Sequence, residues 1–148
     1  MKRRERGHAM IELALSATVM ITCLAGTFQF GYTFYVYNQL VTAVGNGGRY
    51  AATRTLRAET DKAETAIRNL VVYGDTKPDA DAKPVVAGLT PEQVEVRWVR
   101  DGSGAPSAVG VAIREYKVDA VFKTFTFAER PGVEFPYVGR YAPSEHEQ

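Results

Sequence analysis

The sequence has few of the residues that disulfide-stabilised, metal-binding and nucleic-acid-binding proteins need. Its 148 residues include one cysteine, Cys23, so no disulfide can form within the chain. The two histidines lie near opposite ends, and we expect no metal site. The formal net charge of +1 provides no basic field for nucleic acid. The acidic residues show no nucleophile–base pattern, so we also expect no enzymatic activity and no cofactor.

Charged residues are also absent from one long stretch, between Glu12 and Arg49. Residues 11–30 are mostly apolar, and twenty helical residues span about 30 Å, the thickness of a hydrocarbon core. The aromatic residues at the far end resemble those of a membrane interface: Phe28, Phe30, Tyr32, Phe34, Tyr35 and Tyr37. These features predict a transmembrane helix over residues 8–37 with an outer aromatic belt.

A cleaved signal peptide and a buried helix of a soluble protein are the two alternatives for this stretch. A signal peptide has an apolar core of about 7–15 residues followed by small residues. Here the apolar run is longer and bulky aromatic residues follow it. The rest of the chain is too small to enclose a buried helix of this length. A membrane anchor fits the sequence best.

The start of the apolar run has an unusual order of residues. A basic leader, residues 1–7, ends in Gly7, and Glu12 is the fifth residue counted from His8. The excess of lysine and arginine in the leader predicts a cytoplasmic N-terminus. A carboxylate at the edge of a membrane span is costly, so Glu12 is a functional candidate. The alternative is an interfacial acid that only reaches the lipid head groups.

We predict that residues 38–74 form an exported helical segment. Three glycines interrupt it (Gly45, Gly47 and Gly48), and each costs a helix about 1 kcal/mol relative to alanine. They predict a kink, a break or close packing. Of these we expect a hinge, and a phosphate-binding loop would need a preceding strand and a lysine. Apolar residues at helical spacing then predict an amphipathic helix that ends near Gly74: Leu56, Ala63, Ile67, Leu70 and Val71.

The period of the apolar residues changes beyond a polar loop, residues 75–91. Two alternating runs predict an antiparallel hairpin: Val94, Val96 and Trp98, then Val109, Val111 and Ile113. The alternation falters near Glu115, where we expect a bulge, and Phe125 and Phe127 indicate a third strand.

The predicted fold class is α+β. A long N-terminal transmembrane helix precedes a small exported head, in which the amphipathic helix covers one antiparallel sheet. The sheet is expected within residues 92–143, and a disordered tail over residues 144–148.

Three stretches of the chain resemble TadE-like pseudopilins of the tight-adherence type IV pilus. They are Gly7 to Leu15, Leu24 to Arg54, and the later hairpin with Tyr116-Lys117-Val118. The resemblance implies a prepilin peptidase that cuts between Gly7 and His8. It also implies that Glu12 helps dock the cut subunit into an assembly.

The partners implied by this resemblance are the prepilin peptidase, other pilin subunits and an assembly platform in the bacterial inner membrane. The head would then lie in the periplasm or outside the cell. Two other functions stay open at this point. One is a single-pass membrane protein with an uncleaved leader and an exported binding domain, and the other is an exported enzyme.

Overall fold

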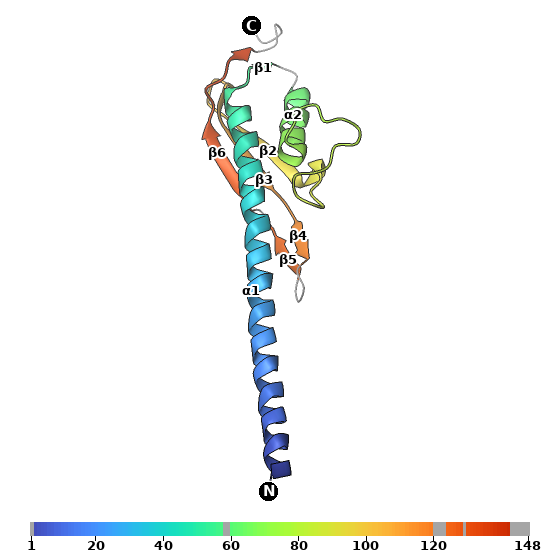
Figure 1. Cartoon of the computed structure of the whole chain (residues 1–148). Coiled ribbons are helices and arrows are strands. Elements are labelled where there is room, and N and C mark those ends of the chain that lie inside the picture. The colour runs from blue at the N-terminus through green and yellow to red at the C-terminus, as the bar shows by residue number, and fades with distance from the viewer. Residues whose placement is uncertain (1, 58–59, 120–123, 129, 143–148) are drawn as a thin grey trace.

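A single helix runs from one end of the molecule into an α+β head (Figure 1). The structure, a computed structural model, describes residues 2–57, 60–119, 124–128 and 130–142. Helix α1 (Lys2–Thr53) has 52 residues, which extend about 78 Å. Its N-terminal half projects from the head and its C-terminal half forms part of the head, which confirms the predicted class. The tail expected over residues 144–148 lies outside the described residues.

The second helix, α2 (Thr60–Tyr73), packs against α1 through its apolar stripe. Ile67 and Val71 are fully buried, whereas Arg68 and Glu64 form an ion pair of 3.4 Å on the more exposed side. Gly74 ends the helix with φ of +76°, a conformation in which glycine has no steric penalty. The predicted amphipathic helix and its end are therefore confirmed.

The predicted start of this helix is wrong, because Leu56 lies in a strand. Strand β1 (Leu56–Arg57) pairs in parallel with β7 (Tyr141–Ala142). The Leu56 N–H donates to the Arg140 carbonyl at 2.8 Å. The buried Leu56 thus belongs to a tertiary contact with a segment more than eighty residues away, which local helical spacing does not reveal.

The main sheet contains three antiparallel strands in the order β2-β3-β6. After a short 3₁₀ helix, η1 (Pro91–Gln93), these are β2 (Val94–Arg100), β3 (Pro106–Ile113) and β6 (Gly132–Pro136). The predicted hairpin is confirmed, with Val96 opposite Val111. In the turn between its strands, the Ser103 hydroxyl and N–H and the Ala105 N–H donate to the Asp101 carboxylate. These hydrogen bonds hold the pKa of Asp101 below its ordinary value.

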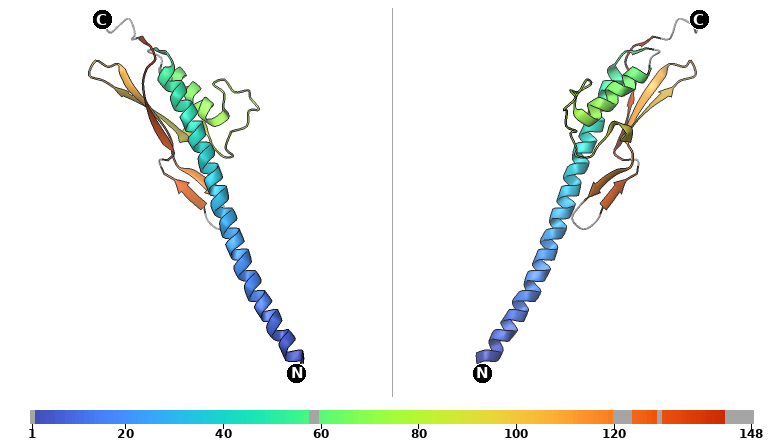
Figure 2. Two further views of the ribbon diagram at one scale, coloured as in Figure 1. Left: turned by 60° about the vertical axis from the view of Figure 1, so that its left-hand side comes forward. Right: turned by 90° about the vertical axis from the view of Figure 1, so that its right-hand side faces the viewer.

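Both helices cover the same face of this sheet (Figure 2). The core between them includes Leu40 and Val44 of α1, Ile67 of α2 and Val109 and Val111 of β3, each at most 1% exposed. The sequence predicted that the amphipathic helix alone covers the sheet. In the structure it shares this face with α1. The second half of α1 is an equal part of the core.

A separate pair of strands lies below the main sheet, beside α1 (Figures 1 and 2). Strands β4 (Tyr116–Asp119) and β5 (Thr124–Phe127) are antiparallel, so the expectation of a single sheet is wrong. Glu115 has φ of +53°, which ends β3 and turns the chain into β4. A turn therefore stands where a bulge was expected, and it separates the third predicted strand from the first hairpin.

Tyr137 joins the C-terminal segment to the end of α1. Its hydroxyl donates to the Arg54 carbonyl at 2.8 Å and accepts from the Leu56 N–H at 3.1 Å. The Gly139 N–H donates to the Ala52 carbonyl at 3.0 Å. The Tyr137 ring also lies edge-on to Trp98, with 6.0 Å between centroids. These contacts close the head at the end of α1 that is farther from the N-terminus.

Candidate functional site

The projecting half of α1 exposes a continuous apolar surface. Exposed fractions of its large apolar side chains run from 44% at Tyr32 to 70% at Met10 and Phe30. The exposed residues are Met10, Ile11, Leu13, Leu15, Val19, Met20, Ile21, Leu24, Phe28, Phe30, Tyr32, Phe34 and Tyr35. An apolar surface of this extent is expected to contact lipid or protein rather than water.

Three threonine hydroxyls along this surface are paired within the helix. The hydroxyls of Thr18, Thr22 and Thr27 each donate to the carbonyl four residues earlier, at 2.8, 2.8 and 3.0 Å. Backbone groups within a helix are likewise paired, as a hydrocarbon environment requires. By length and composition, the segment Gly7–Thr53 contains a window able to cross a membrane. These features define the chain as an α+β protein with a candidate membrane-spanning helix.

The three residues of the predicted processing junction lie in the first turns of α1. Gly7, His8 and Glu12 are all exposed, and His8 and Glu12 are one helical turn apart. A Cβ atom built on Gly7 meets no atom within 4 Å in the described part of the chain. The fold of the protein therefore does not require glycine at this position.

The spacing of Glu12 and the aromatic residues matches the thickness of a bilayer. Tyr32 lies twenty residues after Glu12 in the same helix, which corresponds to a rise of about 30 Å. The hydrocarbon core of a membrane has about this thickness. A bilayer with Tyr32 at one edge therefore has Glu12 at the other edge.

The predicted hinge at Gly45, Gly47 and Gly48 is not present, because α1 continues through all three residues. A Cβ on Gly47 would overlap a methyl group of Val71 in α2. A Cβ on Gly48 would lie 2.8 Å from the Phe135 ring of β6. Two of the three glycines thus allow α2 and β6 to approach the backbone of α1 closely.

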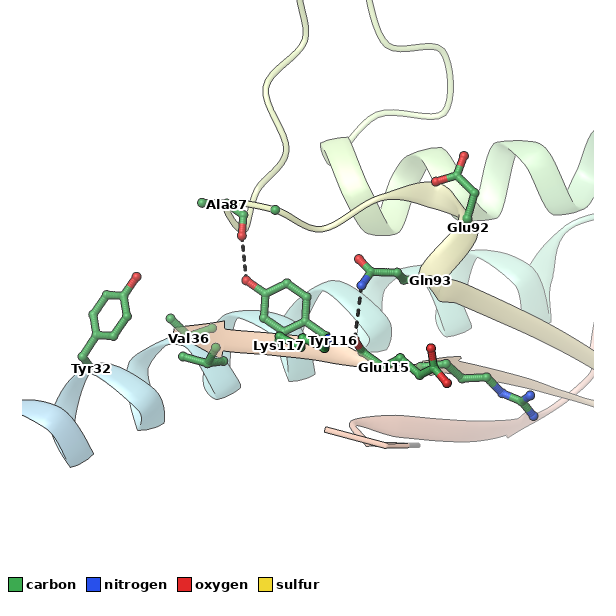
Figure 3. A pocket seen from close by; sticks show the side chains of 11 residues that line it. Tyr32, Val36, Ala87, Glu92, Gln93, Glu115, Tyr116 and Lys117 are labelled. Carbon is green, nitrogen blue, oxygen red and sulfur yellow. Dashed lines mark hydrogen bonds between the residues drawn. The ribbon is translucent and has the colours of Figure 1, made fainter. Parts of the chain in front are cut away.

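A hollow of about 810 Å³ is lined by residues of both α1 and β4 and was not expected from the sequence (Figure 3). Tyr32 and Val36 of α1 line it together with Tyr116 and Lys117 of β4. The Tyr116 hydroxyl donates to the Ala87 carbonyl at 2.7 Å, which fixes the ring at the edge of the hollow. The only sequence signal for this arrangement was the short alternation of Tyr116 with Val118, both of which are buried.

One acidic side chain that lines this hollow has a shifted pKa. The Thr90 hydroxyl and the Glu92 backbone N–H stabilise the Glu92 carboxylate and lower its pKa below the ordinary value. Glu92 therefore stays ionised near neutral pH. The hollow has both signs of charge, since Lys117 and Arg114 also line it.

Residues 7–49 match the model of the family described as TadE-like protein. The resemblance inferred from the sequence is therefore confirmed over this segment, which begins at Gly7 and ends within α1. It covers the projecting surface of α1 and the first part of the head core, but not the sheet. Comparisons with curated proteins and with solved structures found no significant match.

Proposed function

We propose that this protein is a pseudopilin subunit of a tight-adherence pilus, and that it is not an enzyme. It is anchored in the bacterial inner membrane by α1 and cut by a prepilin peptidase between Gly7 and His8. The observation that carries the proposal is the start of the TadE-like match at Gly7. The match begins where a basic leader meets an apolar helix that exposes its side chains.

The structure of Gly7 supports a role in recognition by a peptidase. Glycine is unfavourable within a helix, and here no described atom lies within 4 Å of the Cβ position of Gly7. A peptidase that holds the backbone closely gives a separate reason for glycine, because a side chain would prevent the approach. Cleavage after Gly7 also removes the basic leader and gives His8 a free amino group.

The charge distribution supports an orientation with the N-terminus in the cytoplasm. The leader contains Lys2, Arg3, Arg4 and Arg6 with one acid, Glu5. Positive charge next to a span favours the cytoplasmic side. The head then lies on the periplasmic side, where other pilin subunits and the assembly platform would contact it.

Glu12 supplies a reason for one subunit to bind another. An acid at the middle of a membrane costs about 2.5–3.5 kcal/mol, and less near the edge. The amino group of His8 in a neighbouring subunit would recover part of this cost by pairing with the carboxylate. Because the two groups lie near the same end of α1, this pairing favours one axial register between neighbouring helices.

Replacement of Glu12 by glutamine is expected to leave membrane insertion unchanged and to reduce incorporation into the pilus. The amide cannot form the ion pair, although its size and its place on the helix are retained. Incorporation is measured by immunoblotting of sheared pili, and insertion by the membrane fraction of the same cells. Wild-type incorporation of the Glu12→Gln chain would remove Glu12 from the mechanism.

The mass of the intact protein from its native host tests the proposed function. We expect a chain that begins at His8. A chain that still begins at Met1 would instead support a single-pass anchored protein with an exported binding domain. Turnover of a hydrolase substrate by the full chain would contradict the non-enzymatic role.

A further inference from the structure

We propose that the β4–β5 hairpin rests in the head-group layer of the leaflet on the head side of the membrane. Lys117 and Arg130 would bind the phosphates of anionic lipids there. The inference rests on the membrane span of α1 that the proposed function includes. It adds a second, peripheral contact between the head and the bilayer.

The first support is the level of β4 along α1. With Tyr32 at the edge of the hydrocarbon, the head-group layer covers the next 5–7 Å or so. Val36 lies four residues later, a rise of about 6 Å. Tyr32 and Val36 line the same hollow as Lys117 (Figure 3). Lys117 pairs with Thr126, the neighbour of Phe127, and the Phe127 ring contacts Tyr37, the residue after Val36. Lys117 is therefore near the level of the head groups.

The second support is the attachment of the hairpin to α1. The Phe127 ring lies 5.5 Å from the Tyr37 ring, and Tyr116 and Val118 share a buried cluster with Val36. Strands β4 and β5 lie along α1 on the side toward its N-terminal half (Figures 1 and 2). Its position relative to the membrane is thus determined by the position of α1.

The third support is the charge on the outer side of the hairpin. A surface hollow of about 870 Å³ is lined by three basic residues, Arg114, Lys117 and Arg130, and one acid, Glu115. Arg114 pairs with Glu95 at 2.5 Å, whereas Lys117 and Arg130 are exposed. Their long side chains can reach phosphates while their alkyl parts cover apolar surface. Each basic residue near an anionic membrane strengthens association about fivefold.

The test uses the full chain in vesicles of phosphatidylethanolamine and phosphatidylglycerol. A Cys23→Ser chain has no native thiol, so Thr126→Cys places one fluorophore on the exposed side of β5. A second chain carries Gly102→Cys, in the exposed turn between β2 and β3. Lipids with a head-group spin label should quench the probe at residue 126 strongly and the probe at residue 102 weakly.

Charge reversal tests the basic residues separately from the position of the hairpin. Because α1 still holds the hairpin beside the membrane, Lys117→Glu with Arg130→Glu should weaken quenching at residue 126 without reducing it to the level of residue 102. The matched control reverses two exposed lysines on the loop after α2, Lys77→Glu and Lys83→Glu, and should leave quenching unchanged. Vesicles of phosphatidylcholine should give the same reduction as the Lys117 and Arg130 changes.

Extraction with alkaline carbonate separates the two proposals. If the chain is extracted, the membrane span fails and the hairpin inference fails with it. If the chain stays in the membrane and the two probes are quenched equally, only the hairpin inference is overturned. Contact between residue 126 and a second copy would instead quench the probe without any spin-labelled lipid. That quenching would be lost when the protein is diluted in lipid, and it would also overturn the hairpin inference.

Discussion

A chain in which leucine replaces Gly7 is expected to stay uncut and to begin at Met1. Leucine favours the helix more than glycine does, and a Cβ at this position meets no described atom within 4 Å. The chain should therefore fold and insert as before. Under the proposed function, the leucine side chain prevents the close fit of the backbone into the peptidase, so we expect complete loss of the shortened form. Intact mass of the membrane fraction measures this directly.

The matched control for this experiment is Gly31→Leu, the same change in the same helix. Gly31 is also exposed, and its Cβ position is also open among the described residues. The Gly31→Leu chain should be shortened like the wild type. Normal shortening of the Gly7→Leu chain would show that the junction is not a processing site.

Replacement of Gly48 by leucine is expected to destabilise the head by about 1–2 kcal/mol. The new side chain would begin where the Phe135 ring and a Val133 methyl group lie, each within 3 Å of the Cβ position. Overpacking of a core costs about 1–3 kcal/mol and occasionally more. The gain in helix propensity, about 1 kcal/mol, offsets only part of this cost. Thermal unfolding of the full chain in detergent, followed by the fluorescence of Trp98, measures the change.

Two alanine variants make the comparison stricter. The Cβ position of Gly45 is open among the described residues, so Gly45→Ala should stabilise the chain by up to about 1 kcal/mol. Gly48→Ala should be destabilising, although it adds the same methyl group to the same helix. Equal effects at both positions would mean that Gly48 is not in close contact with β6.

Local periodicity was sufficient to predict the main elements. The uncharged run predicted the first half of α1, and helical spacing predicted α2 up to Gly74. Alternation of Val94, Val96 and Trp98 predicted β2 and its pairing with β3. Each of these elements is determined by the pattern of residues close together in the sequence. A single sequence is therefore sufficient to predict them.

Features that depend on distant residues were not predicted. The glycines near residue 48 indicated a hinge because their cost to a helix is local, whereas their contacts come from α2 and β6. Leu56 followed the helical spacing, yet its N–H pairs with Arg140. The junction at Gly7 was identified from sequence order, but the hollow that Lys117 and Tyr32 both line could be found only from the fold.

The absence of a break in α1 has a mechanical consequence. The segment that exposes Leu24 and Phe30 continues, without a flexible linker, into the segment that buries Leu40 and Val44. A tilt of the N-terminal segment of α1 is therefore transmitted to the sheet as a rigid rotation. An axial load on the N-terminus is carried by the side-chain contacts of the head, because α1 has no extensible segment that could absorb it.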